Sequence, residues 1–335
     1  MRVAVDATAL LDRPTGIGVF TRRVLEGLAR RADVSTTAYA ASWRGRGRLP
    51  EVVPDGVTVA GRPLPARPAR AWWRRFDRPS IEWWTGSVDL VHGPNFVVPP
   101  CRGAEVVTVH DLTTVHHPEL CHRDTLAFPD LVARAIGRGA WVHTVSAFVA
   151  DEVRERFDVD AERVVVVPNG VDRQAGTAPP GPVDGPYVLA LGTVEPRKDL
   201  VSLVSAFEAV AGDRPDLRLV VAGPDGWGVA PFDAAVAASP YRARIVRLGW
   251  VDDDDRRGLL AGATVLAYPS SYVGFGLPPL EAMAEGTPVV ATRAGALPEV
   301  LGEAATLVVV GDVDALASAL AAVVDDGEQR AALVE

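Results

Sequence analysis

The chain has 335 residues, of which 48% are hydrophobic and 23% are charged, and its formal net charge is −9. This length exceeds what one core needs and predicts two domains. An acidic chain is a poor match for general nucleic-acid binding, so we expect no nucleic-acid partner. Cys101 and Cys121 lack the paired spacing of a zinc site. We therefore expect no metal, and the sequence leaves a disulfide open.

The start of the chain and the apolar runs bear on location. Residues 1–6 are typical of a first strand rather than an export signal, and no apolar run approaches the length that spans a bilayer. A low cysteine count favours a reducing compartment. The sequence therefore predicts a cytoplasmic protein with no transmembrane segment.

Short apolar runs alternate with amphipathic stretches along the whole chain. We expect strands at 2–5, 89–91, 105–109, 141–145 and 163–167, and again at 187–191, 217–222, 245–248, 264–267 and 288–291. Helical periodicity marks 18–30, 147–157, 200–211 and 254–260. Continuous apolar strands between helices are typical of parallel sheets covered on both faces. The pattern predicts an α/β chain with two Rossmann-like, doubly wound units.

A segment rich in glycine and proline separates the two halves. It predicts an N-terminal domain over 1–170, a linker over 171–186 and a C-terminal domain over 187–335. Two such domains leave a cleft at the carboxyl ends of their strands, where open α/β sheets bind ligands. Residues 327–335 resemble the opening turns of a helix with no stop signal, which leaves open whether a further helix follows.

The stretch 43–84 is unusually rich in arginine and tryptophan. Its members are Arg44, Arg46, Arg48, Arg62, Arg67, Arg70, Arg74, Arg75, Arg78, Trp43, Trp72, Trp73, Trp83 and Trp84. One interpretation is a solvated loop whose tryptophans enter the core, as is common for basic runs. The other is a surface for an anionic or lipid-linked acceptor, or for peripheral contact with a membrane face.

A glycine loop that leads into a helix stands out at residues 268–286. Gly274, Phe275, Gly276 and Leu277 precede two prolines, which suit the first turn of a helix because they have no N–H to lose. Free N–H groups and the helix dipole favour an anion there. Glu281 falls in the first helical turns, where its carboxylate suits a ribose diol better than a phosphate. The segment predicts a nucleotide site.

Several segments, in the same chain order, resemble motifs of the retaining glycosyltransferases of family 4, which have the GT-B fold. They are Thr15–Gly18, His110–Leu112, Ser146 with Pro168–Asp172, Gly192–Lys198, Arg247–Val251 and Tyr268–Glu285. The resemblance implies two Rossmann-like domains that face each other across a cleft. It implies a nucleoside-diphosphate sugar as the donor, UDP- or GDP-linked, and a hexosyltransferase-type activity with no cofactor.

The resemblance implies roles for single residues. Arg197 and Lys198 would hold the diphosphate and stabilise it as it leaves, which would replace a metal ion. His110 would contact the transferred sugar or stabilise positive charge at its anomeric carbon. Gly16 and Gly18 would meet the diphosphate or the acceptor, and the backbone near Val251 would contact the base.

Val273 departs from the family pattern, which has a glutamate eight positions before Glu281. Valine neither accepts a hydrogen bond nor carries charge, so the usual sugar contact is absent. Three explanations stand open: a donor such as a deoxy sugar that lacks the hydroxyl, a dispensable contact, or impaired activity that leaves a nucleotide-sugar-binding protein.

The predicted reaction is transfer with retention of configuration, with the acceptor hydroxyl attacking from the face that the diphosphate leaves. The acceptor would be a glycan, a lipid-linked molecule or a small molecule, in glycoconjugate, cell-envelope or secondary-metabolite biosynthesis. A sugar-nucleotide epimerase or phosphorylase on the same fold is the main alternative. A nicotinamide-dependent oxidoreductase fits less well, because Thr21 stands where a dinucleotide motif needs glycine. A metal site at Asp252–Asp255 also fits less well than a helix start.

Overall fold

The computed structural model describes residues 1–11, 16–42, 45–60, 62, 66–121, 123, 125–172 and 176–333. Thr15, Trp43, Arg44, His122, linker residues 173–175 and Glu335 lie outside these ranges. The chain divides into two compact units, Met1–Asn169 and Gly170–Glu335. The segment 171–186 thus groups with the second unit.

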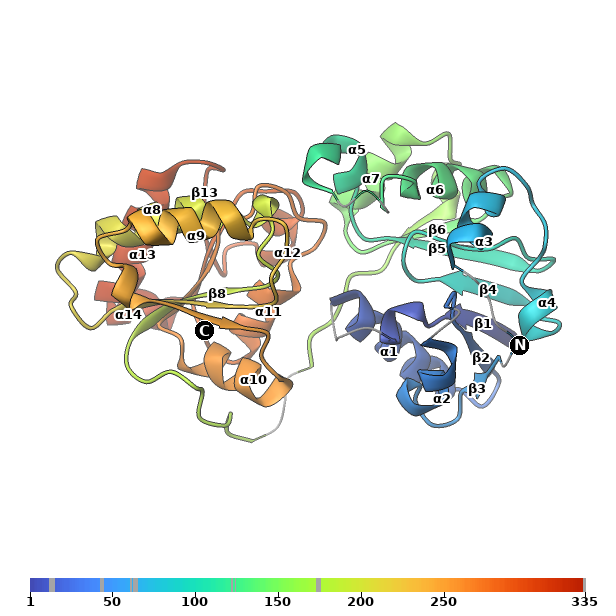
Figure 1. Ribbon diagram of the computed structural model, residues 1–335, viewed down its shortest axis with the longest axis horizontal. Helices are drawn as coiled ribbons and strands as arrows, with labels where there is room; N and C mark the ends of the chain where they lie inside the picture. Colours follow the sequence, from blue (N-terminus) through green and yellow to red (C-terminus); the bar gives the residue numbers. More distant parts are fainter. Residues whose placement is uncertain are drawn as a thin grey trace. The chain divides into compact units, whose positions relative to one another are not determined.

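The first unit is built on a seven-stranded parallel sheet in the order β3-β2-β1-β4-β5-β6-β7 (Figure 1). Its strands are β1 (Arg2–Asp6), β2 (Ser35–Tyr39), β3 (Thr58–Val59), β4 (Leu90–Gly93), β5 (Ala104–Val109), β6 (Trp141–Thr144) and β7 (Val164–Val166). Its helices are α1 (Gly16–Ala29), α2 (Leu49–Val52), α3 (Ala66–Trp73), α4 (Glu82–Thr85), α5 (Thr113–His116), α6 (Phe128–Gly137) and α7 (Ala147–Arg156). The strand order reverses at β1, which pairs in parallel with both β2 and β4.

The second unit repeats this plan with six parallel strands in the order β10-β9-β8-β11-β12-β13. The strands are β8 (Tyr187–Leu191), β9 (Arg218–Ala222), β10 (Ile245–Gly249), β11 (Val265–Tyr268), β12 (Val289–Thr292) and β13 (Thr306–Val308). The helices are α8 (Leu200–Ala211), α9 (Val229–Ala238), α10 (Asp253–Gly262), α11 (Leu277–Ala284), α12 (Leu297–Leu301), α13 (Val313–Asp325) and α14 (Gly327–Ala332). Both sheets confirm the doubly wound α/β prediction.

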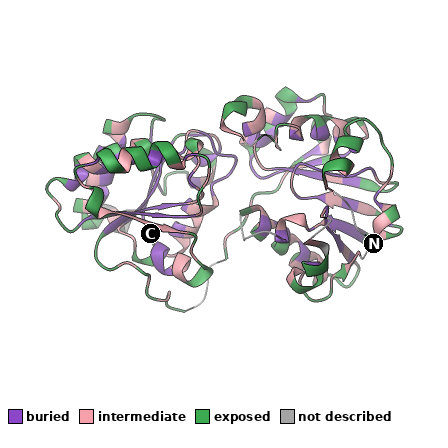
Figure 2. Cartoon of the chain, viewed as in Figure 1, coloured by how far each residue is buried: buried purple, intermediate pink, exposed green. Residues whose placement is uncertain are grey.

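Each sheet is buried on both faces, as Figure 2 shows for the strands. In β8, Tyr187, Leu189 and Leu191 enter one apolar cluster, while Val188 and Ala190 enter the cluster on the opposite face. All five residues are at most 8% exposed. A strand covered on both sides has no polar face to alternate with, which explains its continuous apolar sequence.

The ten predicted strands are all present within one or two residues, but β2, β3 and β13 were missed. The sequence of β2, Ser-Thr-Thr-Ala-Tyr, begins with hydroxyl side chains that resemble a loop, yet Thr36 is buried in the sheet. The expected loop at 43–84 contains α2, β3, α3 and α4.

Two predictions about the chain as a whole find an answer in the described residues. Cys101 and Cys121 are free thiols, so no disulfide joins them. Within the described ranges, no helix is long and apolar enough to cross a bilayer.

Candidate functional site

The basic segment lies at the carboxyl end of β8, in the middle of the second sheet. Gly192, with a φ of +136°, turns the chain out of the strand, and Pro196–Lys198 form a 3-10 turn. Asp199 has a left-handed φ of +48° and caps α8, because its carboxylate accepts the Ser202 N–H at 3.4 Å. Left-handed backbone at a non-glycine residue is costly and concentrates at functional sites.

The side chain of Lys198 lies over the end of the adjacent strand β11. Its Nζ is 4.1 Å from the centroid of the Tyr268 ring and donates a hydrogen bond to the Tyr268 hydroxyl. Burial lowers the pKa of Lys198 from its usual 10.5; the Arg197 charge adds to this and Tyr268 opposes it. An ammonium that has already lost part of its hydration is well suited to hold a phosphate oxygen.

The composition of the chain also singles out Lys198. Lys198 is the only lysine among the 34 basic residues of the chain. Arginine and lysine serve equally well as exposed charges, but they differ at sites that need a compact point charge. A chain that uses arginine everywhere else therefore singles out Lys198 as a candidate for such a site.

Arg197 connects the basic loop to the glycine loop. Its Nε donates to Glu195 Oε2 at 2.8 Å, and its side chain is 24% exposed. Its backbone carbonyl accepts the Ser271 N–H at 2.8 Å and the Ser271 hydroxyl at 3.3 Å. The loops that follow β8 and β11 are therefore joined at Ser271, three residues before the predicted anion loop begins at Gly274.

The glycine loop before α11 is held by close backbone packing. Gly276 has a φ of +100°, and a Cβ there would lie 2.6 Å from Leu297 Cδ2. The Val273 carbonyl accepts the Ala296 N–H at 2.9 Å, and a Cβ on Gly295 would collide with that carbonyl. These contacts fix the loop of β11 against the loop of β12.

Val273 and Phe275 lie within this loop and are buried. The Val273 side chain is 3% exposed and belongs to the same apolar cluster as Tyr268 and Leu297. Phe275 is 8% exposed. At position 273, therefore, an apolar side chain fills a packed position in the ligand-free unit.

Helix α11 begins at Leu277, one residue before the expected start, with Gly276 as its N-cap. Glu281 is its fifth residue and forms an ion pair with Arg256 of α10. Burial raises the pKa of Glu281 and the Arg256 charge opposes this rise. The sequence analysis missed Arg256, because no pattern links two residues 25 positions apart on different helices.

Val251 follows β10 at the edge of the second sheet, with β9 between it and β8. It is partly buried beside an apolar cluster, while Trp250 is 43% exposed. The acidic run that follows starts α10, and the Asp252 carboxylate accepts the Asp255 N–H at 2.9 Å. This geometry is that of a helix cap. Among the described residues, no group of three or more His, Cys, Asp or Glu is placed to hold a metal ion.

In the first unit, His110 follows the carboxyl end of β5. Its Nε2 lies 2.7 Å from the Pro94 carbonyl, which only accepts, so Nε2 carries the proton. Burial lowers the pKa of His110 from 6.5, more than the Pro94 bond and the Asp111 charge raise it. The ring is therefore neutral near pH 7, with Nδ1 as an acceptor for a hydroxyl.

Aromatic rings fix the orientation of His110. Phe20 of α1 contacts it edge to face at 5.0 Å between centroids, and Phe96 does so at 6.1 Å. Phe96 has a left-handed φ of +58°, which is a rare conformation for a bulky residue. Gly16 and Gly18 lie in the first turn of α1, so the Phe20 contact brings that turn close to His110.

A buried chain of hydrogen bonds crosses three strands of the same sheet. His92 Nε2 lies 2.8 Å from Thr108 Oγ1, which lies 3.0 Å from His143 Nδ1. His143 Nε2 is 3.1 Å from the Val167 carbonyl. Thr108 is buried within β5, two residues before His110. No local pattern predicts these hydrogen bonds, because the bonded residues are 16 and 35 positions apart.

Solved structures share the whole architecture. Sucrose-phosphate synthase from Thermosynechococcus elongatus matches with a TM-score of 0.76 and 19% identity, over all of this chain and 92% of that one. The lipopolysaccharide glycosyltransferase WaaG matches with a TM-score of 0.76 and 17% identity, over 99% and 93%. At such low identity these matches establish the fold, which is that of GT-B glycosyltransferases.

Related sequences have a higher identity to this chain than these structures do. O-antigen chain mannosyltransferase B of Escherichia coli is 32% identical over 253 residues, which are 72% of this chain and 66% of that protein. Phosphatidyl-myo-inositol mannosyltransferase of Mycolicibacterium smegmatis is 28% identical over all of this chain and 87% of that protein. The chain thus spans just under two thirds of the first relative.

Two family models divide the chain between them. The model for glycosyltransferase family 4 matches residues 14–175, and the model for glycosyl transferases group 1 matches residues 177–335. The two matches follow the division into two units and include every candidate residue discussed above. The chain belongs to the glycosyltransferases of family 4, the glycosyl transferases group 1.

Proposed function

We propose that this protein transfers a hexosyl group from a nucleoside-diphosphate sugar to an acceptor hydroxyl, with retention of anomeric configuration. The observation that carries the proposal is the junction of the basic loop and the glycine loop. Lys198 contacts Tyr268, and the Arg197 backbone carbonyl accepts both hydrogen bonds from Ser271, in the loop that leads from β11 to α11. Two fixed cations beside a helix N-terminus suit a diphosphate that departs with negative charge.

In the proposed mechanism, Arg197, Lys198 and the amides of Gly274–Leu277 hold the diphosphate. The bond between the anomeric carbon and the phosphate oxygen breaks, and that oxygen keeps the electron pair. The acceptor oxygen then bonds to the same face of the carbon and passes its proton to the leaving phosphate. Neutral His110 accepts a hydrogen bond from a sugar hydroxyl through Nδ1.

Two observations support the proposed donor. Relatives named as mannosyltransferases favour a hexose, and a structural neighbour with a TM-score of 0.76 is described as a complex with UDP and glucose. We therefore propose a UDP- or GDP-linked hexose that needs no cofactor. A deoxy sugar remains the hypothesis motivated by Val273. Equal turnover of a deoxy donor and its fully hydroxylated counterpart would rule that hypothesis out.

The first experiment is thermal-shift screening against UDP, GDP, ADP and dTDP, because a ligand that binds the folded state raises its melting temperature. We expect a rise with one of the first two. Donor consumption is then followed with and without acceptor. Acceptor-dependent consumption supports a transferase, product without acceptor supports an epimerase, and binding without turnover supports a nucleotide-sugar-binding protein. No shift with any nucleotide refutes the donor site.

We further propose that the acceptor is lipid-linked and that the protein acts at the inner face of a membrane. The support is an aromatic surface on the first unit. Trp73 is buried, and its indole N–H donates to the Pro79 carbonyl at 3.0 Å. Other aromatic side chains of the same stretch are exposed. Trp72 and Phe76 form this surface: they are 53% and 50% exposed, and their ring centroids lie 4.9 Å apart. Trp83, on α4, is a separate exposed ring, at 68%.

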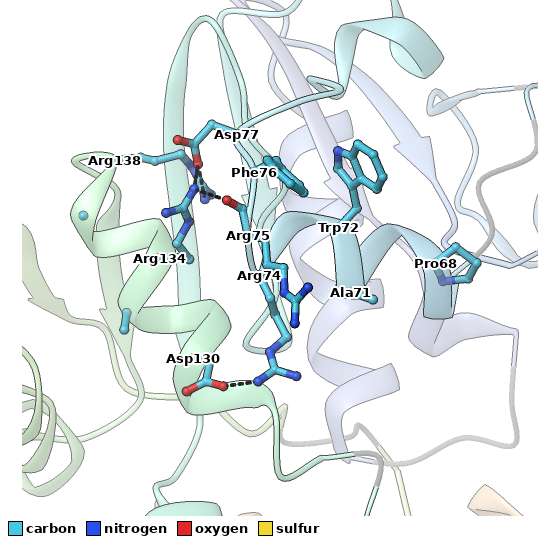
Figure 3. Close-up of a pocket in the computed structure, with 12 residues that line it drawn as sticks. Pro68, Ala71, Trp72, Arg74, Arg75, Phe76, Asp77, Asp130, Arg134 and Arg138 are labelled. Atoms are coloured by element: carbon cyan, nitrogen blue, oxygen red, sulfur yellow. Dashed lines mark hydrogen bonds and ion pairs between the residues drawn. The ribbon is translucent and has the colours of Figure 1, made fainter.

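Arginines border this aromatic surface. An open groove of about 1050 Å³ between α3 and α6 is lined by Arg74, Arg75 and Arg134 next to Trp72 and Phe76 (Figure 3). Two acids also line it, Asp130 in an ion pair with Arg74 and Asp77 in an ion pair with Arg134. Arg75 forms no ion pair among the described residues. Residues 1–169 carry 22 basic and 20 acidic side chains, against 12 and 23 in residues 170–335. Anionic headgroups would thus meet the first unit with less repulsion.

Vesicle co-sedimentation tests this second proposal. We expect binding to vesicles of anionic phosphatidylglycerol, weaker binding at high salt, and little binding to phosphatidylcholine alone. The double variant Trp72→Ala with Phe76→Ala should lose at least half of the bound fraction. Trp141→Ala is the control, because Trp141 is also exposed, at 43%, on the first unit. Equal binding of both variants would refute the proposed surface.

A further inference from the structure

Two parallel ion pairs join α10 to α11 in the second unit. Arg256 pairs with Glu281 through Oε2, and the next residue, Arg257, pairs with Glu285 through Oε1 at 2.8 Å. Glu285 lies about one helical turn after Glu281, as the C-cap that follows α11. Only the first of these pairs includes a residue proposed to contact the nucleotide.

The Arg256–Glu281 pair is partly buried and incompletely satisfied. The two side chains are 30% and 24% exposed. Arg256 Nε is buried and has no partner among the described residues, and Glu281 uses Oε2 alone, so Oε1 keeps its full capacity as an acceptor. A buried carboxylate needs a nearby charge to stay ionised, because burial favours its neutral form.

The charges around Glu281 come from the two helices. Arg256 lowers the pKa of Glu281, while burial and Asp253, also on α10, raise it. From α11 the nearest acid along the chain is Glu285, whose charge Arg257 neutralises. Among the described residues, Arg256 is therefore the one group that favours the charged carboxylate.

We propose that Arg256 is a positioning residue for the nucleotide: it holds Glu281 as an oriented carboxylate through Oε2 and leaves Oε1 to accept hydrogen bonds from the ribose diol. This inference rests on the proposed donor site and adds a residue to it. An ionised acceptor makes stronger hydrogen bonds to hydroxyls than a protonated one. Without Arg256, Glu281 would take up a proton at higher pH and lose its preference for ribose.

The test measures nucleotide affinity by calorimetry between pH 5 and pH 8. The ligands are the nucleoside diphosphate found in the screen and its 2′,3′-dideoxy analogue. The proteins are the wild type, Arg256→Leu, Arg256→Lys and the control Arg257→Leu, which removes the neighbouring ion pair from the same helices. Melting temperatures of all four establish that they are folded, and Arg256→Lys keeps the charge if the leucine variant is unstable.

We expect the wild type to prefer the ribonucleotide about tenfold or more, and Arg256→Leu to lose most of that preference. In Arg256→Leu, the pH at which affinity halves should rise by about one pH unit. Arg256→Lys should recover part of both effects, and Arg257→Leu should behave as the wild type.

Two results overturn the proposal in distinguishable ways. If the wild type binds no nucleotide, the donor site itself is wrong. If the wild type binds and prefers ribose, but Arg256→Leu keeps the same preference and pH midpoint, only the role of Arg256 is wrong. A uniform loss of affinity for both ligands at every pH also overturns it, because that result indicates general attraction of the diphosphate.

Discussion

Replacement of Lys198 by methionine tests two effects of its buried ammonium, one on turnover and one on the stability of the folded chain. Methionine keeps an unbranched side chain against Tyr268 and removes the charge. If Nζ stabilises the leaving diphosphate, its loss should reduce kcat by about 10²–10³-fold, or roughly 3–4 kcal/mol, as for other fixed donors to a developing oxyanion. Substrate binding should weaken as well, because the ground state already carries the phosphate charge.

The same variant should be more stable than the wild type without ligand. The pKa of Lys198 is lowered in the folded chain, so the folded state binds fewer protons than the unfolded state as pH falls below 10.5. Burial of the charge therefore costs stability at pH 7, and this cost disappears as pH approaches 10.5. The melting temperature of Lys198→Met should exceed that of the wild type at pH 7, and the gap should narrow toward pH 10.

Donor turnover and thermal melts provide the assay, with Arg242→Met as the control. Arg242 is exposed and precedes the amino end of β10, whereas Lys198 follows the carboxyl end of β8. A reagent that labels amines offers an independent measurement, because Lys198 and the N-terminus are the only amines in the chain. Nucleoside diphosphate should protect the Lys198 peptide alone. If Lys198→Met turns over within threefold of the wild type and label reacts equally with and without nucleotide, the assigned role is wrong.

Three further predictions concern stability. Gly276→Ala should lose about 2 kcal/mol, because φ is +100° and its Cβ would lie 2.6 Å from a leucine methyl; a thermal melt should fall by about 4–8 °C, and an unchanged melt would contradict the loop geometry. Val273→Glu should lower the free energy of unfolding by several kcal/mol, since its carboxylate would enter an apolar cluster, and Val273→Ala should lower it less. A stable glutamate variant with raised turnover would show instead that the position faces the donor. His92, His110 and His143 all have a pKa lowered by burial, His92 to about 3, so the unfolded chain binds more protons below pH 6.5; the melting temperature should fall as pH drops from 6.5 toward 4, and a flat profile would contradict this burial.

Local sequence was enough for the elements that are buried on both faces and for the loops that glycine and proline define. The apolar run Tyr187–Leu191 predicts β8 with the bounds that the structure has, and the periodicity of Leu200–Ala211 does the same for α8. Gly274–Pro279 predicts a loop that enters a helix. In each case the physical cause acts within a few residues: burial on two faces, helical spacing, or restricted backbone angles.

Tertiary structure decided the partners of the site residues. Lys198 meets Tyr268 from 70 residues away, because β8 and β11 are neighbours in the sheet. Glu281 meets Arg256 because α10 and α11 pack together, and nothing in either local sequence requires this. The polar strand β2 likewise exists because β1 and β3 pair with it. Local sequence thus determined most of the strands and helices and indicated a candidate anion site. The ion pairs and pKa shifts at that candidate site arise from contacts between distant residues, which only the folded chain makes.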